Sequence, residues 1–292
     1  MAREDNEAAI PLDRTQYDLS DQDIEFFASQ VGIRDRDALK DHILNIQAEA
    51  YEVYPYPCIR LLSFAKLRIS FWLDYQQLLK LGKERKGAIF LEMGCCVGTD
   101  PRKVAADGFP AENIIASDIE PGFWELGHKL FKSTPETFPA RFVPGDALDQ
   151  SFLQVVPPFY SPPNTAVPAL SSLTTLTPLA GHVSAIHSAL FFHLFDEAQQ
   201  LQLARALAGL LSPEPGSLLF GAHGGRVQKG LGSPISRGRR MFCHSPESWA
   251  ELWNGQVFRK GTVEVNSRLV EVSLPTTEGE EFTLLVWSVV RL

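Results

Sequence analysis

The first 85 residues carry apolar side chains at the three- and four-residue steps of amphipathic helices. This spacing predicts one helix over about 36–51 and a longer amphipathic stretch over 62–81. Upstream, Ser20 and Asp23 have the spacing of a helix N-cap. Two prolines keep the intervening segment YPYPCIR out of helix. We therefore expect residues 1–85 to form a helical appendage.

From residue 86 onwards the pattern changes to short apolar runs of strand length that alternate with helical stretches. The predicted strands are AIFLEMG, NIIASD, ARFVPG, VSAIHS, SLLFGAH, TVEVNSRLVEVS and EFTLLVWSVVRL. Alternation of this kind is typical of a parallel sheet built from βαβ units. Only LPTTEGE separates the last two strands, which predicts an antiparallel hairpin. The expected fold is an α/β, Rossmann-like, seven-stranded, mostly parallel sheet with a terminal antiparallel hairpin.

Two long loops interrupt the predicted domain of residues 86–292. The stretch over about 150–181 is rich in Pro, Ser and Thr, and the stretch over 223–244 is rich in Gly and basic residues. Both would leave the carboxyl ends of strands, where open α/β sheets bind their ligands. We expect both to line a pocket.

Composition and charge narrow the class of function. The 292 residues carry a formal net charge of -8, whereas a nucleic-acid binder needs clustered cations, so no nucleic-acid partner is expected. No run approaches the roughly 20 apolar residues of a transmembrane helix, and the N-terminus has no signal-peptide pattern, so we expect a cytoplasmic protein without a membrane span. The four cysteines form no CxxC pair, so neither a metal site nor a disulfide is predicted.

The segment FLEMGCCVGTD is the most informative part of the chain. Its apolar strand leads through Gly94 and Gly98 into a helical stretch, as at nucleotide-binding turns. A dinucleotide fingerprint requires G-x-G-x-x-G, but here Cys96 and Thr99 occupy the second and third glycine positions. A nicotinamide-dependent oxidoreductase is therefore disfavoured.

The segment instead resembles the first motif of class I S-adenosylmethionine-dependent methyltransferases, an acidic residue before a glycine turn, with Glu92 as that residue. Asp118 ends the next strand, 26 positions after Glu92, and Asp146 follows the third strand. The resemblance implies that Glu92 meets the methionyl ammonium, Asp118 the ribose and Asp146 the adenine of S-adenosyl-L-methionine. The implied cofactor-binding set is Glu92, Gly94, Cys95, Cys96, Gly98, Asp118, Ile119, Asp146, Ala147, His187 and Ser188. Helix capping is the alternative for Asp118 and Asp146, and simple packing for His187 and Ser188.

A narrower resemblance covers most of the chain. AYEVYPYPCIR, VSAIHSALFFHLFDE and SPESWAELW are similar to segments of fungal methyltransferases of meroterpenoid and related secondary-metabolite pathways. It implies O-methylation of a carboxylate on a hydrophobic polyketide-terpenoid-type acid by a homodimer, with residues 1–85 as lid and dimerisation element. An ionised carboxylate needs no general base, whereas a phenol acceptor would.

Several residues are candidates for the acceptor side of the pocket. His193, on a predicted apolar helix, would contact acceptor or cofactor near the methyl group, positioning it rather than acting as a base; a satisfied core histidine is the alternative. The candidate substrate-binding residues are Tyr54, Tyr56, Arg60 and Arg240. An arginine can hold a carboxylate with two hydrogen bonds, although ordinary surface pairing is an open alternative for Arg60. Arg237 and Arg239 are further candidate anchors.

Two other functions remain open beside carboxylate methylation. One is O-methylation of a phenol on an aromatic small molecule. The other is a non-catalytic regulatory protein that binds S-adenosylmethionine without making product.

Overall fold

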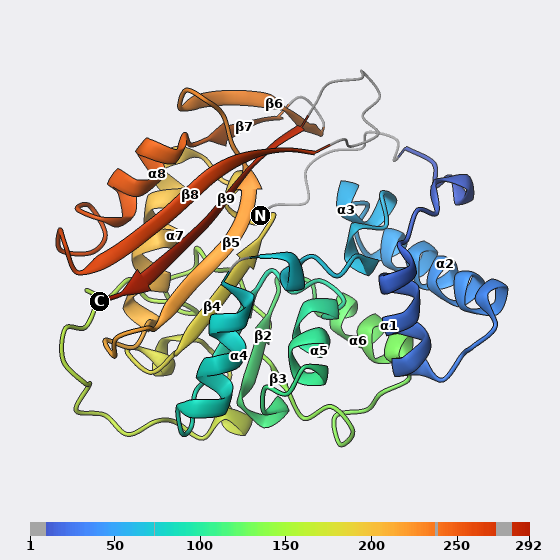
Figure 1. Cartoon of the computed structure of the whole chain (residues 1–292), viewed down its shortest axis with the longest axis horizontal. Helices are drawn as coiled ribbons and strands as arrows, with labels where there is room; N and C mark the ends of the chain where they lie inside the picture. The colour runs from blue at the N-terminus through green and yellow to red at the C-terminus, as the bar shows by residue number, and fades with distance from the viewer. Residues whose placement is uncertain (1–9, 73, 237–238, 273–281) are drawn as a thin grey trace.

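The computed structural model of this protein describes residues 10–72, 74–236, 239–272 and 282–292 (Figure 1). Its main sheet has seven strands in the order β3-β2-β1-β4-β5-β9-β8. These are β1 (Phe90–Met93), β2 (Ile114–Ser117), β3 (Arg141–Phe142), β4 (Ala185–Ala189), β5 (Leu218–Gly224), β8 (Val263–Val272) and β9 (Phe282–Arg291). Strands β1 to β5 pair in parallel, whereas β9 is antiparallel to both β5 and β8. The predicted sheet and its terminal hairpin are confirmed.

Helices cover both faces of the sheet, which explains why its central strands β1, β4 and β5 are almost entirely buried. Helices α4 (Tyr75–Glu84) and α5 (Thr99–Ala106) pack on the face that contains Phe90 and Phe220. Helices α7 (Glu197–Leu210) and α8 (Pro246–Trp253) pack on the opposite face, against Leu91 and Leu219. Alternate residues of each strand thus enter two different cores.

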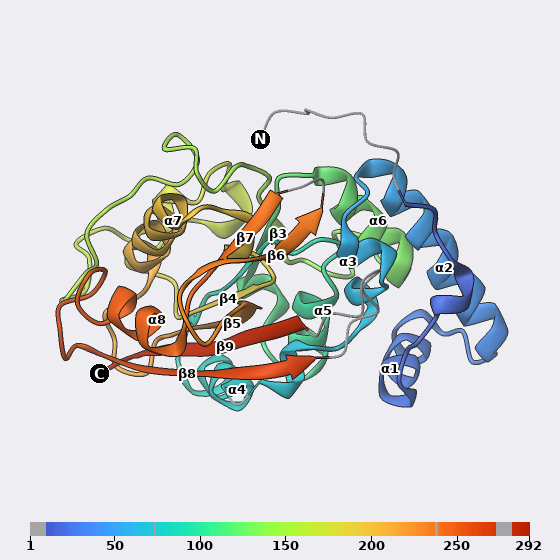
Figure 2. The same cartoon turned by 90° about the horizontal axis from the view of Figure 1, so that it is seen from above.

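The amino-terminal helices lie beside α6 (Pro121–Phe131) at one side of the sheet (Figures 1 and 2). They are α1 (Asp21–Val31), α2 (Arg36–Val53) and α3 (Pro57–Arg60). A shared apolar cluster joins Phe27 of α1 and Ile43 of α2 to Phe131 of α6. The capping box of Ser20 and Asp23 starts α1, and α2 covers the predicted 36–51 helix, so both predictions are confirmed.

The amphipathic stretch over 62–81 is not one helix, which corrects the prediction. It forms two 3-10 turns, η2 (Ser63–Ala65) and η3 (Ile69–Phe71), and only then α4. Side chains from distant segments form hydrogen bonds with backbone groups that would otherwise pair within a helix. The Asp23 carboxylate accepts from the Leu67 amide at 2.8 Å, and the Thr99 hydroxyl donates to the Phe64 carbonyl at 2.6 Å. Tertiary hydrogen bonds therefore override the helical periodicity.

Two predicted irregular segments contain regular structure. Pro57 opens the one-turn helix α3, because proline is tolerated at the first helical position. The second predicted loop contains β6 (Gly230–Ser236) and β7 (Arg239–Cys243), a separate antiparallel pair with register shifts.

The predicted loop over 150–181 is confirmed as a long connection with two 3-10 turns, η5 (Leu170–Ser172) and η6 (Thr177–Leu179). The remaining 3-10 turns are η1 (Arg14–Gln16), η4 (Ala111–Asn113) and η7 (Phe192–Leu194). Among the described residues, no helix has the length and apolar character needed to cross a membrane.

Candidate active site

The chain turns between β1 and α5 at two glycines that cannot be replaced without cost. Gly94 and Gly98 both have φ of +71°, in the left-handed region. A Cβ atom at Gly94 would lie 2.8 Å from Cδ2 of Phe191, and one at Gly98 would lie 2.6 Å from Cζ3 of Trp124. Gly98 is also the N-cap of α5, whose first amides lack partners within the helix. The turn thus lets a ligand approach the backbone closely and offers it the N–H groups at the start of α5.

Two cysteines lie between these glycines. Cys95 is buried, and Cys96 has φ of +49°, which is uncommon for a residue with a side chain. The Cys96 thiol is hydrogen-bonded to the thiol of Cys58 on α3, and all four cysteines are free. The amino-terminal appendage therefore contacts the turn directly.

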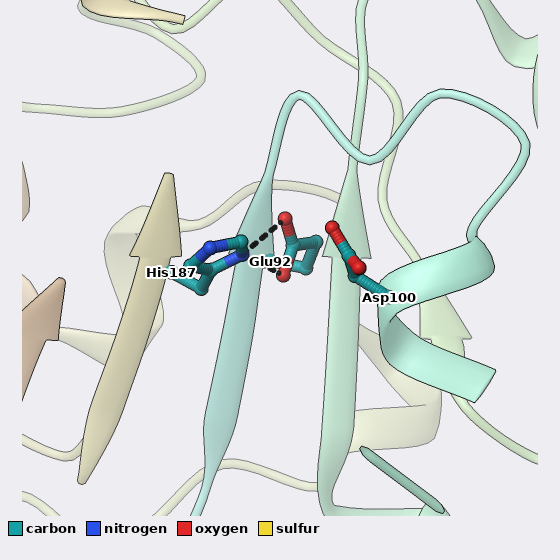
Figure 3. A group of neighbouring side chains, drawn as sticks. All are labelled: Glu92, Asp100 and His187. Carbon is teal, nitrogen blue, oxygen red and sulfur yellow. Dashed lines mark hydrogen bonds and ion pairs between the residues drawn. The ribbon is translucent and has the colours of Figure 1, made fainter. Parts of the chain in front are cut away.

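A cluster of buried Glu92 and His187 and half-buried Asp100 lies below the turn (Figure 3). Glu92 and His187 are partners across β1 and β4, so their side chains leave the sheet on the same face. His187 Nδ1 lies 2.9 Å from Oε1 and 2.8 Å from Oε2 of Glu92. Asp100 projects towards them from the first turn of α5, and the three ligand-type atoms lie within 4.8 Å of one another.

Burial drives all three groups towards their neutral forms. It raises the pKa of Glu92 well above its usual value and lowers the pKa of His187 to about 4. Burial and the neighbouring Glu92 carboxylate raise the pKa of Asp100 to about 7. Asp100 Oδ1 and His187 Nε2 are buried, and within the described residues neither has a hydrogen-bond partner. The cluster thus has acceptor capacity suited to a small cation, which would favour the charged carboxylates.

Asp118 follows β2 and organises the neighbouring backbone. Its carboxylate accepts from the Cys96 amide at 2.8 Å and from the Glu120 amide at 3.1 Å. Burial raises the pKa of the Asp118 carboxyl. Ile119, the next residue, is an exposed apolar side chain with an exposed fraction of 41%.

The remaining predicted cofactor residues lie at the same edge of the sheet. Asp146 follows β3 and accepts from the Leu148 amide at 2.9 Å, while Ala147 is buried in the apolar core. Ser188 lies next to His187 on β4 and faces the other side of the sheet. Its buried Oγ has no partner within the described part of the chain. The structure thus brings these positions to the carboxyl ends of β2, β3 and β4.

An aromatic group from the appendage lies close to Asp118. The rings of Tyr54 and Tyr56 lie 4.2 Å apart, and Tyr56 lies 6.0 Å from Phe123 of α6. Burial and the nearby Asp118 carboxylate raise the pKa of Tyr56. Arg60 ends α3, and its backbone carbonyl accepts from the buried Gln47 amide at 3.0 Å.

Arg240 lies farther along, in the β6–β7 hairpin. Its guanidinium donates to the carbonyl of Gly232 at 2.9 Å and to that of Leu231 at 3.5 Å. These hydrogen bonds link the Arg240 side chain of β7 to backbone carbonyls of β6. Of the other two predicted anchors of this segment, Arg237 lies outside the described residues, and Arg239 is the first residue of β7.

His193 lies in the 3-10 turn η7 after β4, not on a helix as its apolar surroundings predicted. The helical pattern starts only at Asp196, which caps α7. The ring is 8% exposed, and its Nδ1 accepts from the Gly224 amide at 3.2 Å. Burial lowers the pKa of His193 to about 4.

Sequence reasoning assigned no role to two charged residues of this region, Asp100 and Arg68. Asp100 is the last residue of the turn motif, two residues after Gly98, so the sequence offered a signal for it. Its proximity to Glu92 follows only from the fold. Arg68 lies in the irregular segment before α4, and its charge interacts with Asp100. Its place could not be predicted because that segment was expected to be helical.

Comparisons with known proteins agree with this architecture. Residues 13–65 match the family model "Meroterpenoid methyltransferase N-terminal domain". The chain is 31% identical to the O-methyltransferase phiE of Fungal sp. (strain ATCC 74256), over 80% of this chain and 71% of phiE. It is also 31% identical to the Asnovolin E/Chermesin D methyltransferase nvfJ of Aspergillus novofumigatus, over 73% of this chain and 68% of nvfJ.

Among solved structures, a complex of DhpI with SAH aligns at a TM-score of 0.44 and 12% identity, over 87% of this chain and 96% of that chain. The two sequence relatives are more similar to this chain. The alignment covers more than two thirds of each relative, at 31% identity. This chain therefore belongs to the same family of fungal S-adenosylmethionine-dependent methyltransferases as phiE and nvfJ.

Proposed function

We propose that this protein transfers the methyl group of S-adenosylmethionine to a carboxylate of a hydrophobic, polyketide-terpenoid-type acid in secondary-metabolite biosynthesis. The observation that most supports a cofactor with a cationic end is the cluster of Glu92, Asp100 and His187 beside the glycine turn. The Glu92 carboxyl is buried, and the buried Oδ1 of Asp100 lacks a hydrogen-bond partner in the described structure. An ammonium group would supply the missing donors.

The proposed cofactor contacts run from the glycine turn to the end of β3. Glu92 would accept from the methionyl ammonium, and Gly94 and Gly98 let the backbone approach the ligand. Asp118 would accept from the ribose hydroxyls. The other proposed contacts, along the turn and towards the adenine, are Cys95, Cys96, Ile119, Asp146, Ala147, His187 and Ser188.

The bound cofactor supplies an electrophilic methyl group, and its transfer to a carboxylate forms one C–O bond, breaks one C–S bond and moves no proton. The chain's own residues therefore have to hold the acceptor in line and exclude water, which can contribute on the order of 7 to 11 kcal/mol. A carboxyl group with a reference pKa of about 4.3 is ionised near pH 7 and needs no base.

The acceptor would lie between the appendage and the carboxyl ends of the strands. Tyr54 and Tyr56 offer an apolar aromatic surface close to Asp118. We propose Arg60 as a carboxylate anchor, because a guanidinium can donate two parallel hydrogen bonds to one carboxylate. Arg240 already uses two of its five N–H donors within the β6–β7 hairpin, which leaves others that could reach a carboxylate.

We further propose that residues 1–85 act as lid and dimerisation element of the methyltransferase domain at 86–292, and that the protein is a cytoplasmic homodimer. The apolar cluster that joins α1 and α2 to α6 supports the close association of the two parts. Light scattering on the full chain tests the homodimer, and a monomeric mass would contradict it.

Calorimetric titration tests the proposed function. We expect saturable one-site binding of S-adenosylmethionine and none of NADH. Farnesylated benzoic acid and farnesylated phenol then serve as matched acceptors, and mass spectrometry follows the gain of one methyl group. Ester formation from the acid alone supports the proposal, whereas ether formation from the phenol alone would replace it. Cofactor binding without product from either acceptor would favour a regulatory protein.

A further inference from the structure

The hydrogen bond between His193 and Gly224 fixes which nitrogen of the imidazole carries the proton. A backbone N–H can only donate, so Nδ1, 3.2 Å from the Gly224 amide, must accept with an unprotonated lone pair. In a neutral imidazole the other nitrogen then carries the hydrogen. His193 is therefore locked in the tautomer with an Nε2–H donor.

The same contact opposes a second proton on the ring. A proton on Nδ1 would point at the Gly224 N–H, and burial disfavours the charged form as well. The neighbouring histidine that interacts electrostatically with His193 is His223, whose own pKa burial lowers well below its usual value. His193 is thus neutral at physiological pH and cannot accept a proton at Nε2, which already holds one.

The position of His193 suits contact with an acceptor. It follows β4 in η7, two residues after Phe191, whose ring lies against Gly94 of the cofactor turn. The ring of Phe282, at the start of β9, lies 6.5 Å from the imidazole. His193 Nε2 is not among the fully buried, unpartnered atoms of the described residues, and no hydrogen bond involves it there. His193 is 8% exposed, so this donor lies just beneath the surface at the carboxyl ends of β4 and β5, where such sheets bind ligands.

We propose that the His193 Nε2–H group donates a hydrogen bond to the carboxylate of the acceptor and selects an anionic oxygen over a phenol hydroxyl. This inference rests on the proposed function. The bond orients one carboxylate oxygen so that the other is free to take the methyl group, and it requires no proton transfer. A phenol would need a base, which this tautomer does not offer. His193 is therefore a positioning and specificity-determining residue.

Nitrogen-15 NMR of the histidine-labelled full chain tests the tautomer without turnover. We expect the His193 ring to be neutral, with Nδ1 unprotonated and Nε2 protonated. Its nitrogen signals should not change from about pH 5.5 to 8, because its pKa of about 4 lies below this range. Its signals should vanish in His193→Gln. A protonated Nδ1, or a titration near neutrality, would overturn the inference.

Kinetics with the farnesylated benzoic acid test the contact. Loss of a hydrogen bond to a charged group in His193→Phe should lower kcat/KM by about 10- to 100-fold. His193→Gln should recover most of that loss, because its amide can accept from Gly224 and donate outwards. Cofactor affinity should stay within about twofold in both variants, and His182→Gln, at an exposed loop contact with Thr165, serves as the control.

The outcomes separate the two proposals. Normal ester formation by His193→Phe would overturn this inference alone. Failure of the wild-type protein to methylate the acid would overturn the carboxylate acceptor and this inference together. A His193→Phe protein that has lost cofactor binding would show a structural role and also contradict the inference.

Discussion

His187 Nδ1 lies 2.8 Å from Oε2 of Glu92, and both side chains are closed off from solvent where β1 and β4 pair. The two residues are 95 positions apart in sequence, so the parallel register of the strands creates the contact. The carboxyl of Asp100 lies in reach of this pair, so the three side chains together offer hydrogen-bond acceptors to a cation.

Glu92→Gln should weaken the binding of S-adenosylmethionine by about 10- to 100-fold, because an amide replaces the carboxylate that would accept from the ammonium. The melting temperature should not fall, since burial opposes the charge that the substitution removes. Calorimetry and thermal unfolding measure the two effects. Unchanged affinity would exclude Glu92 from the ammonium site.

Asp100 should make cofactor binding depend on pH. Its pKa of about 7 means that it is protonated at pH 6 and ionised at pH 8, and only the ionised form attracts an ammonium. Affinity for S-adenosylmethionine should therefore rise with pH through about 7, and Asp100→Asn should flatten this rise. Titrations at pH 6, 7 and 8 measure it, and an equally steep rise in the variant would assign the effect to another group.

The raised pKa of Asp100 also predicts how the stability of the cofactor-free protein depends on pH. The folded-state pKa of Asp100 lies above the unfolded value of 3.8, so its contribution to stability is fully present below that value and is lost as pH rises through about 7. The free energy of unfolding of Asp100→Asn should fall less between pH 5 and 8 than that of the wild-type protein. Urea unfolding at both values measures the difference, and parallel behaviour of the two proteins would contradict the assignment.

Local sequence signals predicted the elements but not the contacts between them. The capping box at Ser20 and the strand that contains Glu92 depend on neighbouring residues alone. The segment before α4 escaped prediction because Asp23 and Thr99 supply hydrogen-bond partners from far along the chain. The β6–β7 hairpin escaped because glycines and basic residues give no strand periodicity.

In the candidate site, too, some residues could be predicted from local sequence, whereas the contacts between distant segments could not. Glu92, on β1, and Asp118, just after β2, could be predicted from their spacing within a known motif. The partnership of Glu92 with His187 depends on strand register, and that of His193 with Gly224 on how η7 meets the end of β5. No pattern within a single segment encodes either contact.

Asp118 should be tested with two substitutions, because the structure gives it two tasks. Asp118→Asn keeps an oxygen that can accept from a backbone amide, whereas Asp118→Ala leaves the amides of Cys96 and Glu120 without this acceptor. Both variants should lose cofactor affinity, and Asp118→Ala should in addition lose about 1 to 3 kcal/mol of folding free energy. Calorimetry and urea unfolding report the two losses, and wild-type affinity in Asp118→Asn would remove this residue from the ribose site.

Gly94→Ala should disturb the site through Phe191, and Gly32→Ala provides a matched control. The two glycines have nearly equal φ, +71° and +72°, so the alanine variants share the cost of a left-handed residue, on the order of 1 kcal/mol. Only at Gly94 does a Cβ meet a neighbour, Cδ2 of Phe191 at 2.8 Å, whereas nothing lies within 4 Å at Gly32. Gly94→Ala should therefore cost more stability and also weaken cofactor binding, while Gly32→Ala leaves binding unchanged. Adding Phe191→Ala to Gly94→Ala should restore part of the lost affinity for S-adenosylmethionine, measured by calorimetry, because it removes the obstructing ring. Equal stability losses in the two single variants would show that backbone conformation, and not the Phe191 contact, makes glycine necessary in this turn.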